Sequence, residues 1–298
     1  MEAKLYSALY RLVFNTPHTS RRPRELYDDR FVLMVHLWGV LHDRSQSWSC
    51  DPQNWPKKLL DRPLISQSRL SRRLRTLGVQ QLIERLLSAA TALLDDAPVP
   101  PLIKTIDSKP LTVGACSKDA DAKRGRVANG QFARGYRLHV VMHGRIARHW
   151  TLLPLSDHDT VGATLLLPRL EGGGYVLADN AYDSNNCHAL AAAANHQLVA
   201  PPRTANRHVR DAAHNRPERL RALDMFHGPL EKCGVPSTFG QSLYDGRQRI
   251  ESGFGGLTFA GLGALPPFVR RPHRVALWTA GKLLAFACRA AINKGVMA

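Results

Sequence analysis

The sequence is poor in cysteine and in acidic residues, and it contains no long uninterrupted apolar segment. Its five cysteines are an odd number, lie far apart and form no C-x-x-C pair. This pattern argues against a disulfide framework, a cysteine zinc site and thiol redox chemistry. The apolar stretch at the N-terminus is short and contains Glu2, unlike a signal peptide. We therefore expect a protein of a reducing, cytoplasmic compartment.

An apolar stretch near the C-terminus, Val275–Ile292, is interrupted by Lys282 and Arg289. The two charges are seven positions apart (289 − 282 = 7), so on a helix they share one face and leave the remainder apolar. The stretch predicts an amphipathic helix that packs on the protein, not a membrane span.

Positive charge is what the sequence has in excess. Its 41 Lys+Arg against 24 Asp+Glu give a net charge of +17 and a pI near 10.2. Such a balance favours a polyanionic partner, with nucleic acid as the first choice and an anionic membrane surface as the second. The preference for Arg over Lys suits phosphate recognition, although a GC-rich genome produces the same bias. With 298 residues, 44% of them hydrophobic, the chain has the composition of one large or two modest globular domains.

The first third of the chain reads as helical. Helical spacing of apolar residues predicts four helices, Met1–Asn15, Arg24–Leu41, Ser66–Leu77 and Val79–Asp95. A Pro-rich segment, Ala97–Pro101, follows them. We therefore divide the chain into an all-α N-terminal region (1–96), a hinge (97–101) and a second domain (102–298).

After the hinge the pattern changes to strands. Strands are predicted at Leu102–Asp107, Gly135–Met142, Ile146–Pro154 and Gly174–Asp179, with a short apolar stretch at Gln197–Ala200. Helices are predicted at Thr160–Leu170, Ser184–Asn195, Ser242–Leu257 and Pro272–Asn293. This order indicates an α/β domain with a mixed sheet flanked by helices. The polar, Arg-rich region around 203–240 looks like an insertion of undetermined structure.

Three carboxylates are candidate functional residues because of their positions in the predicted strands and helices. Asp107 and Asp179 each end an apolar strand, where α/β proteins carry their chemistry, although Asp is also a common turn and cap residue. Glu251 lies in a predicted helix whose Tyr244, Arg247 and Glu251 fall on one stripe. The two intervals are equal, 179 − 107 = 72 and 251 − 179 = 72.

An oxygen-rich set of three carboxylates suits magnesium better than zinc. Two such ions about 4 Å apart catalyse in-line phosphoryl transfer in nucleases and polymerases. Together with the basic chain, Asp107, Asp179 and Glu251 therefore predict phosphoryl transfer on nucleic acid.

Four segments give the chain a resemblance to the DDE transposases of bacterial insertion sequences, which have an RNase H-like catalytic domain. IDSKPL at Ile106–Leu111 is similar to the strand of the first Asp, and RGYRLHVVM with LSDHDT (ending at Thr160) to the next two strands and their His-Asp turn. ADNAYDS at Ala178–Ser184 is similar to the second-Asp motif. YDGRQRIE at Tyr244–Glu251 fits the subgroup with a Tyr-Arg-Glu signature helix.

The resemblance implies a role for each matching position. Asp107, Asp179 and Glu251 become the catalytic residues and the ligands of two Mg²⁺ ions, with Mn²⁺ as a substitute. Tyr244 and Arg247 become contacts to the DNA end. The family often has a Lys seven residues after the Glu, where this chain has Thr258, so Arg249 or a later Arg takes its place or end binding is weaker. We interpret His158 and Asp159 as part of a turn that orders the chain after the third strand, in preference to a catalytic role.

Further basic residues are candidate DNA contacts. The segment 65–78 reads as a recognition-type helix with Leu70, Leu74 and Leu77 on one side; either it belongs to a helix-turn-helix or it is an exposed basic helix. The basic residues in the connection after Asp107 either contact phosphates or belong to a solvated loop. The candidates are Arg69, Arg72, Arg73, Lys109, Lys118, Lys123, Arg124 and Arg126.

The resemblance implies a transposase that cleaves DNA at insertion-sequence ends and transfers the 3′-OH strand into target DNA. Its expected partners are terminal inverted repeats, target DNA and a second copy of the chain on DNA, with no membrane partner. The expected location is the nucleoid in a bacterial cytoplasm. Two alternatives remain at this stage: a catalytically decayed, transposase-derived DNA-binding protein, and an RNase H-like nuclease without strand transfer.

Overall fold

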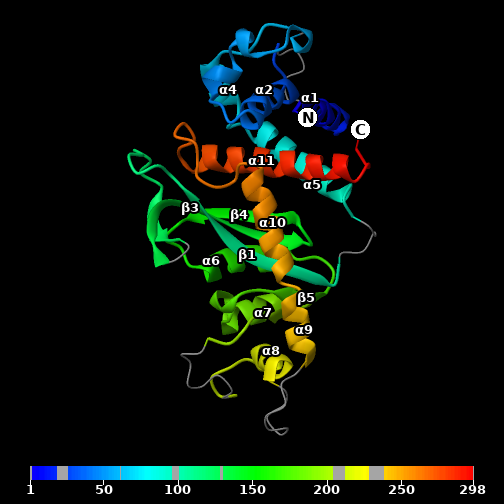
Figure 1. The fold of residues 1–298 in the computed structure, drawn as a ribbon, viewed down its shortest axis with the longest axis vertical. Coiled ribbons are helices and arrows are strands. Elements are labelled where there is room, and N and C mark those ends of the chain that lie inside the picture. The colour runs from blue at the N-terminus through cyan, green and yellow to red at the C-terminus, as the bar shows by residue number, and fades with distance from the viewer. Residues whose placement is uncertain are drawn as a thin grey trace. The chain divides into compact units, whose positions relative to one another are not determined.

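A computed structural model of the chain describes residues 2–18, 26–60, 62–95, 101–127, 130–203, 212–227 and 238–297. The chain forms two compact units, which we describe separately (Figure 1). The helical unit combines Met1–Asp95 and Val113–Asp121 with Leu257–Ala298, and the sheet unit combines Asp96–Thr112 with Ala122–Gly256. The packing therefore differs from the contiguous division into 1–96 and 102–298, because the C-terminal segment packs with the N-terminal helices.

The helical unit is built on four helices that the apolar spacing indicated, α1 (Glu2–Asn15), α2 (Asp29–Leu41), α5 (Leu77–Ala92) and α11 (Pro272–Asn293). The carboxylate of Asp28 caps α2 by accepting a hydrogen bond from the amide of Phe31 at 2.8 Å. The predicted start of this helix at Arg24 lies outside the described residues. Shorter elements complete the unit: α3 (Gln46–Ser49), η1 (Pro52–Asn54), η2 (Lys57–Leu59) and α4 (Gln67–Arg73).

The basic segment 65–78 is shorter as a helix than predicted. Helix α4 ends at Arg73, and Leu77 begins α5 instead of ending α4. Leu70 and Leu74 are buried as expected, but Leu77 is exposed, so the predicted apolar side of three leucines is wrong. Ser66 precedes α4 without a side-chain capping bond.

Helix α11 corrects the prediction for Lys282. Its ammonium group is buried and forms an ion pair with Asp43 at 2.8 Å, while lying 5.3 Å from the ring centre of Trp278. The charge therefore does not mark a solvent face, because a partner on another part of the unit compensates its burial. Among the described residues α11 is the helix long and apolar enough to cross a membrane, but 72% of its apolar window is buried, as in the core helix of a soluble protein.

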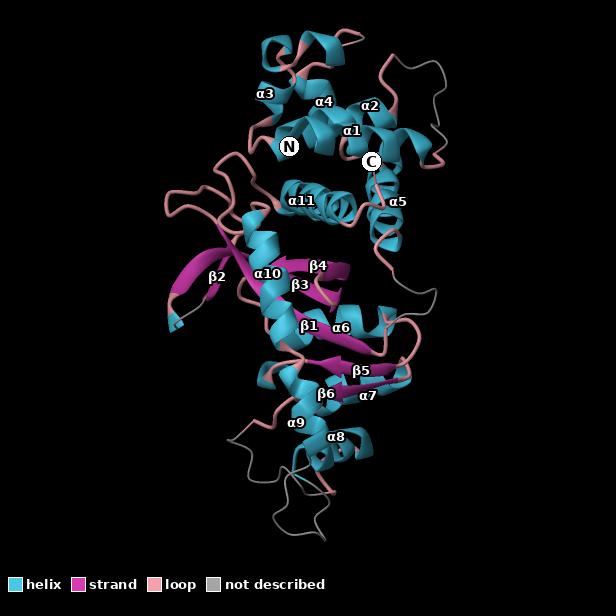
Figure 2. Ribbon diagram, turned by 45° about the vertical axis from the view of Figure 1, so that its right-hand side comes forward, coloured by secondary structure: helices cyan, strands magenta, loops and turns pink. Residues whose placement is uncertain are grey.

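The sheet unit contains a six-stranded mixed sheet, shown in magenta in Figure 2. Its central strands follow the order β4-β3-β1-β5-β6, and β2 also pairs with β3. Strand β3 is antiparallel to β1, β2 and β4, whereas β1, β5 and β6 are parallel. This is the predicted RNase H-like arrangement. The strands are β1 (Ile103–Thr112), β2 (Lys123–Arg126), β3 (Phe132–His143), β4 (Ile146–Pro154), β5 (Gly174–Leu177) and β6 (His196–Val199).

Helices lie on both faces of the sheet. Helices α6 (Asp159–Leu166) and α7 (Asn185–Ala193) pack on one face through a cluster that includes Ile106, Val141 and Val176. The alternate residue Leu177 belongs to a second cluster on the other face. The remaining elements are η4 (Leu167–Arg169), η5 (Asn180–Tyr182), α8 (Pro217–His227), α9 (Thr238–Asp245) and α10 (Gln248–Phe259). Helix α8 lies in the predicted insertion.

The predicted helix Ser242–Leu257 is divided into α9 and α10. The amide of Gly246 bonds the carbonyl of Leu243 at 3.0 Å, and the amide of Arg247 bonds that of Tyr244 at 2.8 Å, both in i→i+3 geometry. Glycine at position 246 stabilises a continuous helix poorly, which accounts for the break. Tyr244, Arg247 and Glu251 therefore do not form one stripe of one helix, and that prediction is wrong.

Candidate active site

Asp107 and Asp179 come together because of the parallel register of their strands. Thr105 of β1 is paired with Leu177 of β5, and each carboxylate lies two residues beyond that pair. Asp107 does not end its strand as predicted, since β1 continues to Thr112 along β3. Instead the neighbouring β5 ends, which leaves Asp107 and Asp179 side by side where one side of β1 has no strand partner.

Both carboxylates are harder to ionise than usual. Burial raises the pKa of Asp107 to about 6, and the nearby charges of Asp179 and Asp159 add to the effect. Burial also raises the pKa of Asp179, with Asp159 as a further cause. Like charges in a half-buried site repel each other, so the pair would be stabilised by a cation. The protein thus neutralises the negative charge of these predicted metal ligands only in part.

Arg247 supplies part of the missing charge. One of its terminal nitrogens lies 2.9 Å from a carboxylate oxygen of Asp107, and its guanidinium is 6.0 Å from the ring centre of Tyr244. Its Nε is buried without a hydrogen-bond partner among the described residues. The guanidinium therefore keeps a free donor beside the carboxylate that it neutralises.

Asp159 belongs to this site, contrary to the expectation of a simple turn. It accepts hydrogen bonds from the Ser108 hydroxyl and from Arg137, whose Nη1 is 3.2 Å from both of its carboxylate oxygens. The amide of Ser108 in turn donates to Asp107 at 2.7 Å. Sequence spacing gave no sign of this network, because it joins β1, β3 and α6. It fixes the backbone that carries Asp107.

The donor set fits a hard divalent cation. Magnesium is often held by one or two carboxylates together with substrate phosphates. Beside Asp107, Asp179 and Asp159, the hydroxyl of Tyr182 is fully buried without a partner among the described residues. A buried donor of this kind indicates that water or a ligand completes the site.

Glu251 is not part of the carboxylate pair. It lies exposed on α10, whereas Ile250 is buried and Gly253 lies against Met142 of β3. Within the described ranges no group of three acidic, His or Cys residues is close enough to hold a metal ion. The structure thus brings together two of the three predicted ligands.

The other predicted DNA contacts have different surroundings. Arg69 and Arg72 are exposed on α4, but Arg73 is bound to Asp29 at 2.8 Å and so has a structural role. Lys109 is half-buried on β1, and Thr258 is exposed on α10. The side chain of Arg249 lies outside the described residues.

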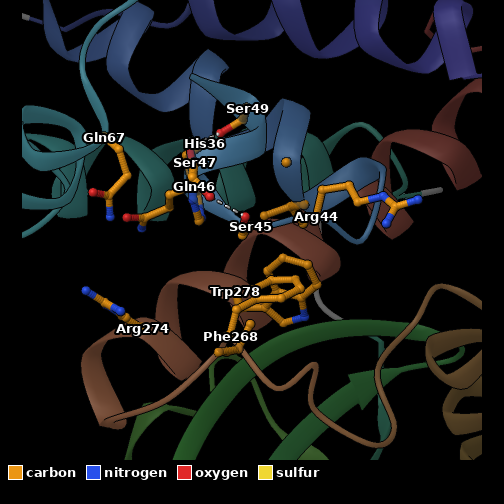
Figure 3. A pocket seen from close by; sticks show the side chains of 13 residues that line it. His36, Arg44, Ser45, Gln46, Ser47, Ser49, Gln67, Phe268, Arg274 and Trp278 are labelled. Atoms are coloured by element: carbon orange, nitrogen blue, oxygen red, sulfur yellow. Dashed lines mark hydrogen bonds between the residues drawn. The ribbon is translucent and has the colours of Figure 1, made fainter. Parts of the chain in front are cut away.

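A cavity of about 230 Å³ lies within the helical unit (Figure 3). Its walls come from α2, from the segment around α3 and from α11, and include Arg44, Ser45, Arg274 and Trp278. None of the described residues that line it is acidic.

A second buried acid lies four residues after Asp179. Asp183 is only 3% exposed, and it forms an ion pair with Arg219 of α8 at 2.6 Å and a hydrogen bond with His188 at 3.2 Å. The amide of Arg203 also donates to it at 3.1 Å. Burial alone would raise its pKa, but these hydrogen bonds lower the pKa to about 2. The ion pair between Asp183 and Arg219 holds α8 against the rest of the sheet unit.

The site and the fold agree with a match to a known family. Residues 100–286 match the transposase DDE domain, and the chain belongs to this family. It is therefore a DDE transposase, an enzyme of phosphoryl transfer on DNA. No curated protein matches the chain at a significant level.

Solved transposase structures are similar at low identity. The synaptic complex of the piggyBac transposase with hairpin DNA has a TM-score of 0.49 and 11% identity over 97% of this chain and 76% of that one. The Mos1 strand transfer complex has a TM-score of 0.25 and 15% identity over 81% and 80%. The Mos1 mariner paired end complex with Mn has a TM-score of 0.21 and 14% identity over 79% and 80%. These likenesses are too distant to transfer a role to any residue.

Proposed function

We propose that this transposase cleaves DNA at the terminal inverted repeats of an insertion sequence and joins the freed 3′-OH to target DNA. The observation that carries the proposal is the pairing of Asp107 with Asp179 at matching positions of adjacent parallel strands. The raised pKa values of the two carboxylates favour binding of a cation between them. The guanidinium of Arg247 favours a phosphate group next to that cation.

Asp107 and Asp179 would hold Mg²⁺, with Mn²⁺ as a substitute. Held there, such ions would supply activation of the attacking oxygen and stabilisation of the leaving one. The hydrogen bond from the Ser108 amide and the Asp159–Arg137 network hold Asp107 in place. Glu251 is the proposed third ligand for a two-ion site; its exposed side chain makes no hydrogen bond in the described part of the chain, so its rotamer is free to change on assembly.

DNA binding is assigned to basic residues around this site. Arg247 has a spare buried donor for a phosphate near the scissile bond, with Tyr244 beside it and Arg249 on the same segment. We assign the N-terminal helices, through Arg69 and Arg72, to the terminal repeat. A homodimer on paired ends in a bacterial cytoplasm completes the proposal.

A cleavage and joining assay tests it. The purified chain, Mg²⁺ and DNA with the repeats that flank its gene should give cut and joined products, while Asp107→Asn and Asp179→Asn should lower the rate about a thousandfold or more, since the metal ion supplies several kcal/mol of stabilisation. Asp224→Asn removes an exposed acid of α8 and should leave the rate unchanged.

The exposed position of Glu251 favours one alternative, a DNA-binding protein that has lost catalysis. In that case the wild-type chain binds the repeats without metal and makes no cuts, and Glu251→Gln changes nothing. Cuts without joined products would instead identify a nuclease. Either result contradicts the proposed strand transfer.

A further inference from the structure

The hydroxyl of Tyr182 is a buried group beside the carboxylates that has no role in the proposed function. Tyr182 ends η5, the turn that Asp179 caps, and its amide donates to the carbonyl of Asp179 at 3.2 Å. The residue is 0% exposed, and its hydroxyl has no hydrogen-bond partner among the described residues. Buried tyrosine hydroxyls usually have a partner, because a polar group without one destabilises the fold.

The ring of Tyr182 is packed among the segments that carry the carboxylates. We call Asp107, Asp159 and Asp179 the acid cluster. The buried apolar cluster of Tyr182 includes the residue before the first acid, a residue of α6 four positions after the second and the residue before the third: Ile106, Ala163 and Ala178. Packing therefore fixes the ring next to the backbone of all three acids.

The hydroxyl is a donor with acceptors near it. Burial raises the pKa of Tyr182 well above its usual value, and the charges of the acid cluster raise it further. The phenol therefore keeps its proton and can donate a hydrogen bond. The printed bonds of the acid cluster come from other groups: the amide and hydroxyl of Ser108, the guanidinium groups of Arg137 and Arg247, and the amide of Ala181.

We propose that Tyr182 is a positioning residue that donates a hydrogen bond to the acid cluster when a divalent cation is bound there. A carboxylate has about four acceptor positions, so one that binds a cation can still accept such a bond. Groups that hold metal ligands in this way contribute about ten- to a hundredfold to metal affinity. The inference rests on the proposed function, because Asp107 and Asp179 are its proposed ligands.

The first test compares stability with and without a cation. Tyr182→Phe removes one oxygen and keeps the ring. In EDTA the variant should unfold at a higher urea concentration than the wild type, because an unpartnered buried hydroxyl costs free energy. Mn²⁺ should raise the urea midpoint less in the variant than in the wild type, because a ligand that binds more weakly stabilises less. A hydroxyl with a purely structural role would not reverse its effect in this way.

The second test measures Mn²⁺ affinity of the full chain without DNA, from the electron paramagnetic resonance signal of free Mn²⁺. Tyr182→Phe should weaken binding about tenfold. In cleavage of the repeat DNA, the Mn²⁺ concentration for half the maximal rate should rise by a similar factor. The maximal rate should be unchanged, since the hydroxyl touches no reacting atom. Tyr136→Phe is the matched control, a tyrosine of β3 that is 2% exposed, and should leave Mn²⁺ affinity unchanged.

Two results would overturn the proposal while the proposed function stands. Equal Mn²⁺ affinity of the wild type and Tyr182→Phe would show that the hydroxyl does not support the cation site. A lower urea midpoint of the variant in EDTA would show that the hydroxyl stabilises the fold without a cation. A wild-type chain that binds no Mn²⁺ and cuts no DNA would instead contradict the proposed function, and this proposal with it.

Discussion

Asp179 and Asp183 lie four residues apart, yet their environments are opposite. Asp183 is almost fully buried and its pKa is about 2, whereas the pKa of the less buried Asp179 is raised. The difference lies in their partners. Asp183 is bound by Arg219, His188 and the amide of Arg203. Asp179 accepts one backbone bond, from Ala181, and shares its surroundings with two other acids.

Pairing, not burial, therefore distinguishes the structural carboxylate of Asp183 from those of the proposed metal ligands. An acid that already has an arginine and a histidine has little capacity left for a metal ion. Arg247 forms an ion pair with Asp107, whereas Asp179 feels the guanidinium groups of Arg247 and Arg203 only through space. A shortage of compensating charge is thus the property that suits the pair for catalysis.

The largest expected effect comes from removing the charge of Asp183. Asp183→Asn leaves Arg219 buried without its counterion, and breaking one side of a buried pair costs about 3–5 kcal/mol. We expect the free energy of unfolding in urea at neutral pH to fall by that amount.

Asp179→Asn provides the matched control four residues away. An asparagine oxygen can still accept the bond from Ala181, and the substitution removes a charge that the site disfavours. We expect no loss of stability, or a small gain, together with loss of cleavage. If both variants are equally destabilised, the contrast between the two acids is wrong.

The second expected effect is that the stability contributed by Asp183 depends on pH. Because folding lowers the pKa of Asp183 from its usual value near 3.8 to about 2, its ionisation stabilises the fold above about pH 4. That contribution, about 2 kcal/mol, is lost as the pH falls through about 2. The stability difference between wild type and Asp183→Asn should therefore narrow between pH 4 and pH 2 in thermal unfolding; a constant difference would contradict the assignment.

The smallest expected effect concerns the ion pair of Asp107 with Arg247. Arg247→Gln removes a cation that competes with a metal ion for that carboxylate, so Mn²⁺ affinity in the absence of DNA should rise about fivefold, or about 1 kcal/mol. Calorimetric titration measures it, with Arg221→Gln on α8 as control. Cleavage should fall in the same variant, because Arg247 is also the proposed phosphate contact. Unchanged or weaker Mn²⁺ binding would show that Arg247 supports the metal site instead of competing with it.

The strand positions and the meeting of Asp107 with Asp179 could be predicted from sequence. Apolar runs that lead into an acid predict neighbouring strands whose acids lie close together, and this holds although β1 continues past Asp107 to Thr112. The mixed sheet and the N-terminal helices were confirmed for the same reason: apolar periodicity depends on burial, which the fold preserves.

Contacts between distant segments could not be predicted. Arg219 is far from Asp183 in the chain, and Asp159 reaches Ser108 only because α6 returns to the sheet. The break at Gly246 depends on local geometry that the spacing of Tyr244 and Glu251 does not show. Lys282 was assigned to a charged helix face because its partner Asp43 belongs to a separate segment of the sequence.

The division of the chain into units has a consequence for synthesis. The sheet unit precedes α11 in the sequence, and α11 packs against α5 of the helical unit. On the ribosome the sheet unit can therefore complete its hydrophobic core first. The N-terminal helices keep an uncovered apolar surface until α11 has been made, and a chain released before that point would expose this surface to chaperones and proteases.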